Sequence, residues 1–230
     1  MLKIENEAQS ATVYLYGTIG RDWWDEDSEN TAKSFSKTLD ELSPKPLEIR
    51  IDSCGGDVYE GFAIASAIQR YAGATTAFVD GIAASAASYI AVMADKVVMN
   101  DYAQIMIHDA WTFTGGNSSD LRAMAERLDS IDGQIAMIIA GRSGMDADEV
   151  RGLMDAETWF SADDAKDRGL CDEVVVTEQR VAACLDASMA KLFKNIPESL
   201  ENAESHADGT ICTDAARPVV LGNRVYRTKE

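Results

Sequence analysis

The chain has 230 residues, of which 46% are hydrophobic and 26% charged, and its formal net charge at pH 7 is -18. This length accommodates one domain with a full core and a tail, and the composition is that of an ordinary globular protein. The negative charge disfavours sequence-independent binding to nucleic acid and adhesion to anionic membranes, because both need clusters of Lys and Arg.

Apolar residues alternate or recur at helical spacing through most of the first 176 residues. Strands are predicted over residues 11–17, 47–51, 75–79, 96–99, 103–108 and 173–176. Helices are predicted over residues 31–42, 57–71, 117–141, 146–154 and 161–168, with a further helix that ends near residue 93. This alternation of strands and helices predicts parallel βαβ units and an α/β fold.

Two segments fall outside this pattern. Residues 20–28 read as a polar loop carrying Trp23 and Trp24, which either cover a groove or a neighbouring subunit or plug the base of their own loop. Beyond about Met189 the periodicity weakens, and residues 195–217 are rich in Glu, Ser, Asn and Asp. We therefore predict a domain over residues 1–192 and an acidic, polar and flexible tail over residues 193–230.

The segment Ser53-Cys-Gly-Gly56 joins a predicted strand to a predicted helix. Backbone N–H groups at such a junction point outward, and the helix dipole favours negative charge there. The turn is either an anion-binding site or a plain tight connection. It matches neither of the glycine-rich nucleotide-binding patterns.

The stretch Gly81-Ile-Ala-Ala-Ser-Ala-Ala-Ser-Tyr89 follows another predicted strand, and Asp80-Gly81 is a turn signal. Small neighbours allow a substrate carbonyl to approach Ser85 closely, as at the nucleophile elbow of hydrolases, although the G-x-S-x-G pattern is absent. The alternative is a tightly packed helix start with no catalytic role. Ser88 lies one helical turn further on and is the rival serine.

Histidine is the usual base for a serine nucleophile, and the chain has two. His206 lies in the polar tail, whereas His108 ends an apolar strand, where it could equally be structural. Ligands of α/β sheets bind at the carboxyl ends of strands. Ser85, His108 and the Gly55-Gly56 turn all fall at such ends, which favours catalysis.

The remaining composition argues against metals and export. The four cysteines (Cys54, Cys171, Cys184, Cys212) lack metal-ligand spacing, and two histidines make a zinc site unexpected. No apolar run approaches the roughly 20 residues of a membrane span, and Met1–Glu7 does not resemble a signal peptide. We expect a cytoplasmic protein with reduced thiols, without a metal or cofactor.

Four motifs together resemble the proteolytic subunit of Clp proteases: Asp52-Ser-Cys-Gly-Gly56, Gly81-Ile-Ala-Ala-Ser85, Met106-Ile-His108 and Thr158-Trp-Phe-Ser-Ala. The resemblance covers roughly residues 11–176 and implies the spiral of ββα units shared by Clp proteases and crotonases, with a mostly parallel sheet. The run Asp155-Ala-Glu-Thr-Trp-Phe160 and the run Ser118-Ser-Asp-Leu-Arg resemble the phage and prophage branch. That branch contains head maturation (prohead) proteases, which act on capsid or scaffold proteins in the host cytoplasm or inside a procapsid.

The resemblance implies that Ser85 is the nucleophile, His108 its base, and the N–H groups of Gly56 and Ala86 the oxyanion hole. Glu157 stands where the family commonly has aspartate, and Asp155 is the fallback for this third position. Both acids could instead be solvated loop residues. Cys54 stands where the family usually has proline, which changes the stiffness of the turn but keeps both glycines.

The resemblance also implies a homo-oligomeric ring, with the 117–141 helix as a handle between subunits. A strand near Trp111, Thr112 and Phe113 would pair with extended peptide substrate, beside Gly55. On the sequence alone, the apolar face of that helix and these aromatic residues could be ordinary core.

Several functions remain open. The preferred one is a Clp-like serine endopeptidase, as a prohead protease or as a degradative peptidase that works with an ATP-dependent unfoldase. The alternatives are a crotonase-like acyl-CoA enzyme, which uses paired N–H donors without a serine nucleophile, and an inactive scaffold ring.

Overall fold

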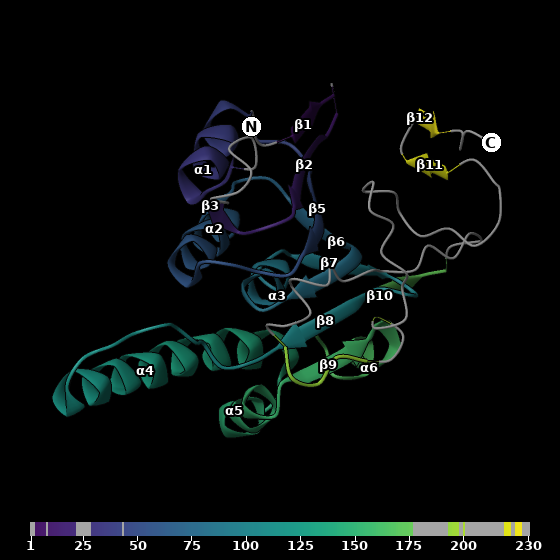
Figure 1. Ribbon diagram of the computed structural model, residues 1–230. Coiled ribbons are helices and arrows are strands. Elements are labelled where there is room, and N and C mark those ends of the chain that lie inside the picture. The colour runs from purple at the N-terminus through teal and green to yellow at the C-terminus, as the bar shows by residue number, and fades with distance from the viewer. Residues whose placement is uncertain are drawn as a thin grey trace.

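The structure is a computed structural model, and it describes residues 3–7, 9–21, 29–42, 44–176, 193–197, 200, 219–221 and 224–226. Within these residues, eight strands form one mixed sheet (Figure 1). Six of them follow the order β1-β2-β5-β6-β7-β10, and β8 pairs with β6 on one side and with β9 on the other. Its strands are β1 (Lys3–Asn6), β2 (Ala11–Tyr16), β5 (Leu47–Ser53), β6 (Thr75–Ala84), β7 (Lys96–Asn100), β8 (Gln104–Ile107), β9 (Thr158–Ser161) and β10 (Glu173–Val175). Two small antiparallel pairs are β3 (Gly20–Arg21) with β4 (Glu29–Asn30) and β11 (Val219–Leu221) with β12 (Arg224–Tyr226).

The pairing in this sheet is parallel except in two pairs: β1 is antiparallel to β2, and β9 is antiparallel to β8. The helices are α1 (Ala32–Glu41), α2 (Val58–Arg70), α3 (Ala86–Ala91), α4 (Ser118–Ser143), α5 (Ala147–Asp155) and α6 (Ala162–Asp167). This is the predicted α/β architecture with a mostly parallel sheet. β1 and β9 are strands that the sequence pattern did not predict.

The helices begin where the sequence supplies capping side chains. Thr31, Asp57 and Ser161 each accept a backbone N–H in the first turn of the helix that follows. Asn117 and Asp120 form a reciprocal capping box at the start of α4, and that helix ends at Gly144, whose backbone is left-handed. The predicted helices are therefore confirmed to within a few residues.

β6 differs from the prediction, because Asp80-Gly81 makes no turn and the strand continues to Ala84. Its first half, Thr76–Val79, pairs with β7, and its second half, Ile82–Ala84, pairs with β8. The Asp80 carboxylate accepts hydrogen bonds from Arg50 on β5 and Tyr16 on β2. Sheet pairing and these contacts across the strands override the local turn preference.

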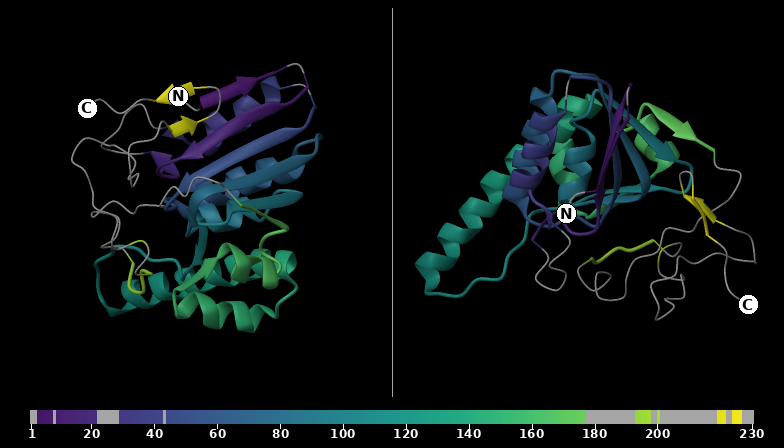
Figure 2. Two further views of the ribbon diagram at one scale, coloured as in Figure 1. Left: turned by 90° about the vertical axis from the view of Figure 1, so that its right-hand side faces the viewer. Right: turned by 90° about the horizontal axis from the view of Figure 1, so that it is seen from above.

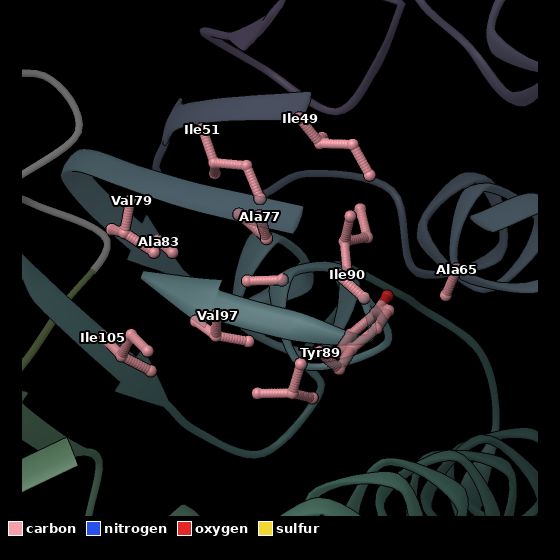
Figure 3. Packing of buried hydrophobic residues seen from close by; sticks show 14 of the residues in the cluster. Ile49, Ile51, Ala65, Ala77, Val79, Ala83, Tyr89, Ile90, Val97 and Ile105 are labelled. Atoms are coloured by element: carbon pink, nitrogen blue, oxygen red, sulfur yellow. The ribbon is translucent and has the colours of Figure 1, made fainter. Parts of the chain in front are cut away.

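The core lies between the sheet and the helices α2 and α3. Figure 3 shows side chains of β5, β6, β7 and β8 directed toward Tyr89 and Ile90 of α3. Tyr89 is buried, and its hydroxyl donates to the carbonyl of Val58 at 3.0 Å. Burial on this scale fixes α3, and with it the residue that precedes the helix, against the sheet.

α4 extends away from the body of the molecule (Figures 1 and 2). Only its second half contributes to the core, through Ile131, Ile135 and Ile139. Residues 108–117, which lead into α4, are irregular, so the strand expected near Trp111–Phe113 is not formed in the single chain. None of the helices among the described residues is long and apolar enough to cross a membrane.

Two sequence predictions lie outside the described residues. One is the loop that carries Trp23 and Trp24. The other is the domain boundary near Leu192, together with most of the tail, including His206.

Candidate active site

Three strand ends bring the predicted site residues to one edge of the sheet. β5, β6 and β8 run parallel, with Ser53 opposite Ala83 and Ala84 opposite Met106. The glycine turn, Ser85 and His108 follow these strands directly. Because parallel strands end at the same edge, residues far apart in the sequence meet there.

Ser85 has an unusual backbone conformation, with φ 53° and ψ -122°. Its N–H donates to the carbonyl of Met106 at 3.0 Å, and α3 begins at the next residue. A serine before a helix normally caps it, but the Ser85 side chain makes no capping bond. Its Oγ lies 2.8 Å from Nε2 of His108 instead, which is hydrogen-bonding distance for a nucleophile and its base.

The glycine turn lies against Ser85. A side chain at Gly55 would meet the Ser85 Cβ at 2.7 Å, and Gly55 has φ 93°. Ile19 donates its N–H to the Gly55 carbonyl at 2.8 Å and accepts the N–H of Asp57 at 2.9 Å. In this parallel bridge the bonds to Ile19 come from Gly55 and Asp57, and the N–H and carbonyl groups of Gly56 itself take no part in them. Gly56 lines the pocket beside Ser85, and its N–H is not used in this bridge.

Ala86 supplies a second N–H at this edge. It is the first residue of α3, and the first N–H groups of a helix have no acceptor within the helix. The N–H of Ser85 is already bound to Met106, so that of Ala86 is the next donor along the chain. Gly56 and Ala86 thus present backbone donors from two different junctions.

His108 is partly buried, and burial lowers the pKa of its imidazole below the ordinary value of 6.5. The charge of Glu157 opposes this by raising the pKa, and that of Lys194 lowers it. The Phe193 ring packs edge-on against the imidazole, with centroids 5.9 Å apart. A neutral imidazole at pH 7 can accept the Ser85 proton.

Of the two acids considered for the third position, Glu157 is the one whose charge acts on the pKa of His108. Glu157 is buried and lies two residues after the end of α5, with φ 49°. Asp155 is exposed at the end of α5 and acts on the pKa of Asp109 instead. Among the described residues no hydrogen bond joins Glu157 to His108; Glu157 Oε1 accepts the N–H groups of Lys194 and Asn195.

A pocket of about 390 Å³ opens beside Ser85 and His108. The residues predicted to contact substrate, Gly55, Trp111, Thr112 and Phe113, all line it. Phe113 and Trp111 are 89% and 49% exposed, so their rings are available to a ligand. Cys54 of the glycine turn also lines it, as do four residues that the sequence did not indicate: Thr18, Val58, Ala110 and Phe193.

A buried carboxylate fixes the chain after His108. Asp132 of α4 accepts the N–H of Ala110 at 2.6 Å, and Arg151 of α5 lies 3.3 Å from its other oxygen. Asp132 is only 3% exposed, so solvent screens its charge weakly. Through these contacts the helices α4 and α5 fix Ala110, one of the residues that line the pocket.

The family model for Clp protease matches residues 19–178. The chain is similar to the ATP-dependent Clp protease proteolytic subunit of Bacteroides fragilis, with 31% identity over 155 residues, 66% of this chain and 75% of that protein. Subunit 3 of the ATP-dependent Clp protease of Rhodococcus jostii is 27% identical over 174 residues, 74% of this chain and 84% of that protein. An asparagine-to-aspartate mutant of ClpP1 from Listeria monocytogenes has a similar solved structure, with a TM-score of 0.62 and 25% identity over 73% of this chain and 92% of that one.

Proposed function

The chain belongs to the Clp protease family of serine endopeptidases, and we propose that it cleaves peptide bonds with Ser85 as nucleophile, His108 as base and Glu157 as the third member of the triad. The observation that carries this assignment is the 2.8 Å distance between Ser85 Oγ and His108 Nε2. The lowered pKa of His108 supports it, because the imidazole is then neutral at pH 7.

The reaction follows from this geometry. His108 Nε2 takes the Ser85 proton as Oγ attacks the carbonyl carbon, and the imidazolium then protonates the leaving amine. Water hydrolyses the acyl-enzyme by the same steps, again with His108 as base. The carboxylate of Glu157 favours the imidazolium electrostatically, since it raises the pKa of His108.

The N–H groups of Gly56 and Ala86 would receive the oxyanion of each tetrahedral intermediate. They belong to the backbone and are fixed before substrate arrives, so no reorganisation is needed as charge develops. Removal of one such donor typically lowers the rate by a factor of about 10²–10³.

The biological role that we propose is a prohead protease, supported by the resemblance of Asp155–Phe160 and Ser118–Arg122 to the phage branch. Capsid or scaffold proteins would be its substrates, in the host cytoplasm or inside a procapsid. The second candidate is a degradative peptidase, because the relatives named above are proteolytic subunits of ATP-dependent proteases. Either role involves a homo-oligomeric ring with residues 1–192 as the protease domain.

The first experiment is labelling with a fluorophosphonate, on wild type and Ser85→Ala side by side. Labelling and peptidase activity that both disappear in Ser85→Ala, with an unchanged circular dichroism spectrum, are the expected result. A folded wild type that neither labels nor cleaves peptides after assembly would contradict the function and favour the scaffold or crotonase alternative.

A second assay separates the two biological roles. A prohead protease should cleave scaffold protein without ATP or an unfoldase. A degradative subunit should leave folded proteins intact until an ATP-dependent unfoldase is added.

A further inference from the structure

The first described residues of the predicted tail, 193–197, return to the active site, and we name them the return segment. Phe193 packs edge-on against His108 and against Trp159 of β9, with ring centroids 5.9 Å and 5.5 Å apart. Ile196 and the nearby Leu200 join an apolar cluster with residues of β6 and β8. These contacts hold the return segment beside the catalytic edge of the sheet.

The return segment also binds the acid of the proposed triad. Oε1 of Glu157 accepts the backbone N–H of Lys194 at 2.6 Å and that of Asn195 at 2.7 Å. The Asn195 side-chain amide donates to the carbonyl of Ala156 at 2.8 Å, so that one residue holds both the carboxylate and the backbone before it. Among the described residues these are the hydrogen bonds that reach the Glu157 carboxylate.

Glu157 needs such partners, because it is only 6% exposed. Burial of a carboxylate removes its hydration, and without hydrogen bonds from the protein this loss destabilises the folded state. The two N–H groups replace part of the lost hydration and fix the side chain, whose charge raises the pKa of His108. Since both bonds fall on Oε1, Oε2 keeps its capacity to accept a further donor.

The geometry points to a positioning role: the backbone N–H groups of Lys194 and Asn195 hold the Glu157 side chain in the orientation that the reaction needs. The family model matches residues 19–178. The residues that position the third member of the triad therefore lie outside the matched part of the chain. Phe193 of the return segment lines the substrate pocket, and the Ser85–His108 hydrogen bond of 2.8 Å is formed with the segment in place. These features favour support of the triad over blockage of it. This inference rests on the serine-peptidase function proposed above.

The test compares Asn195→Pro, which removes the backbone donor, with Asn195→Ala, which keeps it. We expect Asn195→Pro to lower kcat about tenfold to a hundredfold, the usual worth of a hydrogen bond to a charged group, with little change in KM. The acid limb of kcat/KM should move to lower pH, because a displaced Glu157 carboxylate raises the pKa of His108 less. Asn195→Ala should keep that limb and most of kcat.

Lys194→Pro and Lys194→Ala form a second pair, should Asn195→Pro not fold. Lys194→Pro should resemble Asn195→Pro, whereas Lys194→Ala should move the acid limb slightly upward, since the Lys194 charge lowers the pKa of His108. Fluorophosphonate titration gives the active fraction of each variant, and thermal unfolding reports its stability.

Three results would overturn the inference while wild type stays active. The proline variants could match wild type, they could be faster, which would make the return segment an inhibitory cover, or they could lose stability and rate without a shift of the acid limb. A wild type that does not label would instead contradict the proposed function itself.

Discussion

Ser85 and Glu157 are the two non-glycine residues with positive φ in the described part of the chain, at 53° and 49°. Such backbone conformations cost of order 1–3 kcal/mol each and persist where the surrounding structure holds them. The Ser85–Met106 hydrogen bond holds the first, and the return segment holds the second. Both strained residues belong to the proposed triad, which suggests that their conformation serves the chemistry.

The choice between the two acids is testable at the residue scale. Glu157→Ala should lower kcat by at least about 10²-fold, because the acid of a triad orients its histidine and stabilises the imidazolium. Asp155→Ala should stay within a few-fold of wild type, since Asp155 is exposed and does not act on His108. Initial rates on one peptide substrate decide the matter. The reverse ranking would identify Asp155 as the third member.

The pH dependence follows from the direction of the His108 shift. Activity needs the neutral imidazole, so kcat/KM should rise with pH through the pKa of His108, and burial places this rise below 6.5. The His108 imidazole binds a proton more readily in the unfolded chain than in the folded one. His108 therefore lowers the free energy of unfolding as the pH falls below 6.5. A kcat/KM profile from pH 4 to 9 tests the first point. An acid limb above 6.5 would contradict it.

At the scale of elements, the turn after β5 and the junction after β6 depend on each other. The turn reaches Ser85 only because Gly55 has no side chain, and the Ser53 hydroxyl accepts the Gly55 N–H at 3.1 Å and donates to the Gly17 carbonyl at 2.5 Å. A side chain at Gly56 would overlap the carbonyl oxygen of Ile19. These close approaches fix where the N–H of Gly56 points.

Gly56→Ala should therefore abolish most activity. Its φ of 155° and the contact with Ile19 force the turn to move, which displaces the proposed oxyanion donor and costs stability of order 1–3 kcal/mol. Rates and urea unfolding measure the two effects. Gly152→Ala in α5 is the matched control: its side chain would meet open space, and helical alanine stabilises by about 0.5–1 kcal/mol. An active Gly56→Ala would contradict the oxyanion role.

At the scale of the whole molecule, the projecting half of α4 has little to pack against within the chain. Its Leu121 is 46% exposed, and Met137 nearer the body is 71% exposed. A helix that leaves its own domain in this way is stabilised when a neighbouring subunit covers its apolar side chains. The shape thus supports the proposed ring.

Leu121→Asp should shift the protein toward smaller assemblies in analytical ultracentrifugation. The new charge would have to be buried without a partner in the contact between subunits. Ala123→Asp adds the same charge two residues further along, on another side of the helix, and should assemble as wild type does. Equal behaviour of the two variants would exclude Leu121 from the interface.

The sequence by itself determined the α/β fold, the order of the helices and the Clp protease family. The fold is confirmed by the solved ClpP1 structure, and the family by the match over residues 19–178. These features follow from local signals, namely periodicity, capping residues and short motifs, which need no knowledge of distant contacts. For the same reason Ser85, His108 and Gly56 could be singled out, since each stands at a strand end that the pattern marks.

Only the tertiary structure decided the features that depend on partners distant in sequence. The continuation of β6 through Asp80-Gly81 needs β8 and Arg50, which a local turn signal cannot register. The contacts of Lys194 and Asn195 with Glu157 span 37 and 38 positions and use backbone N–H groups, which every residue except proline carries. Because such donors leave no signature in a sequence, the return segment read as an ordinary polar tail.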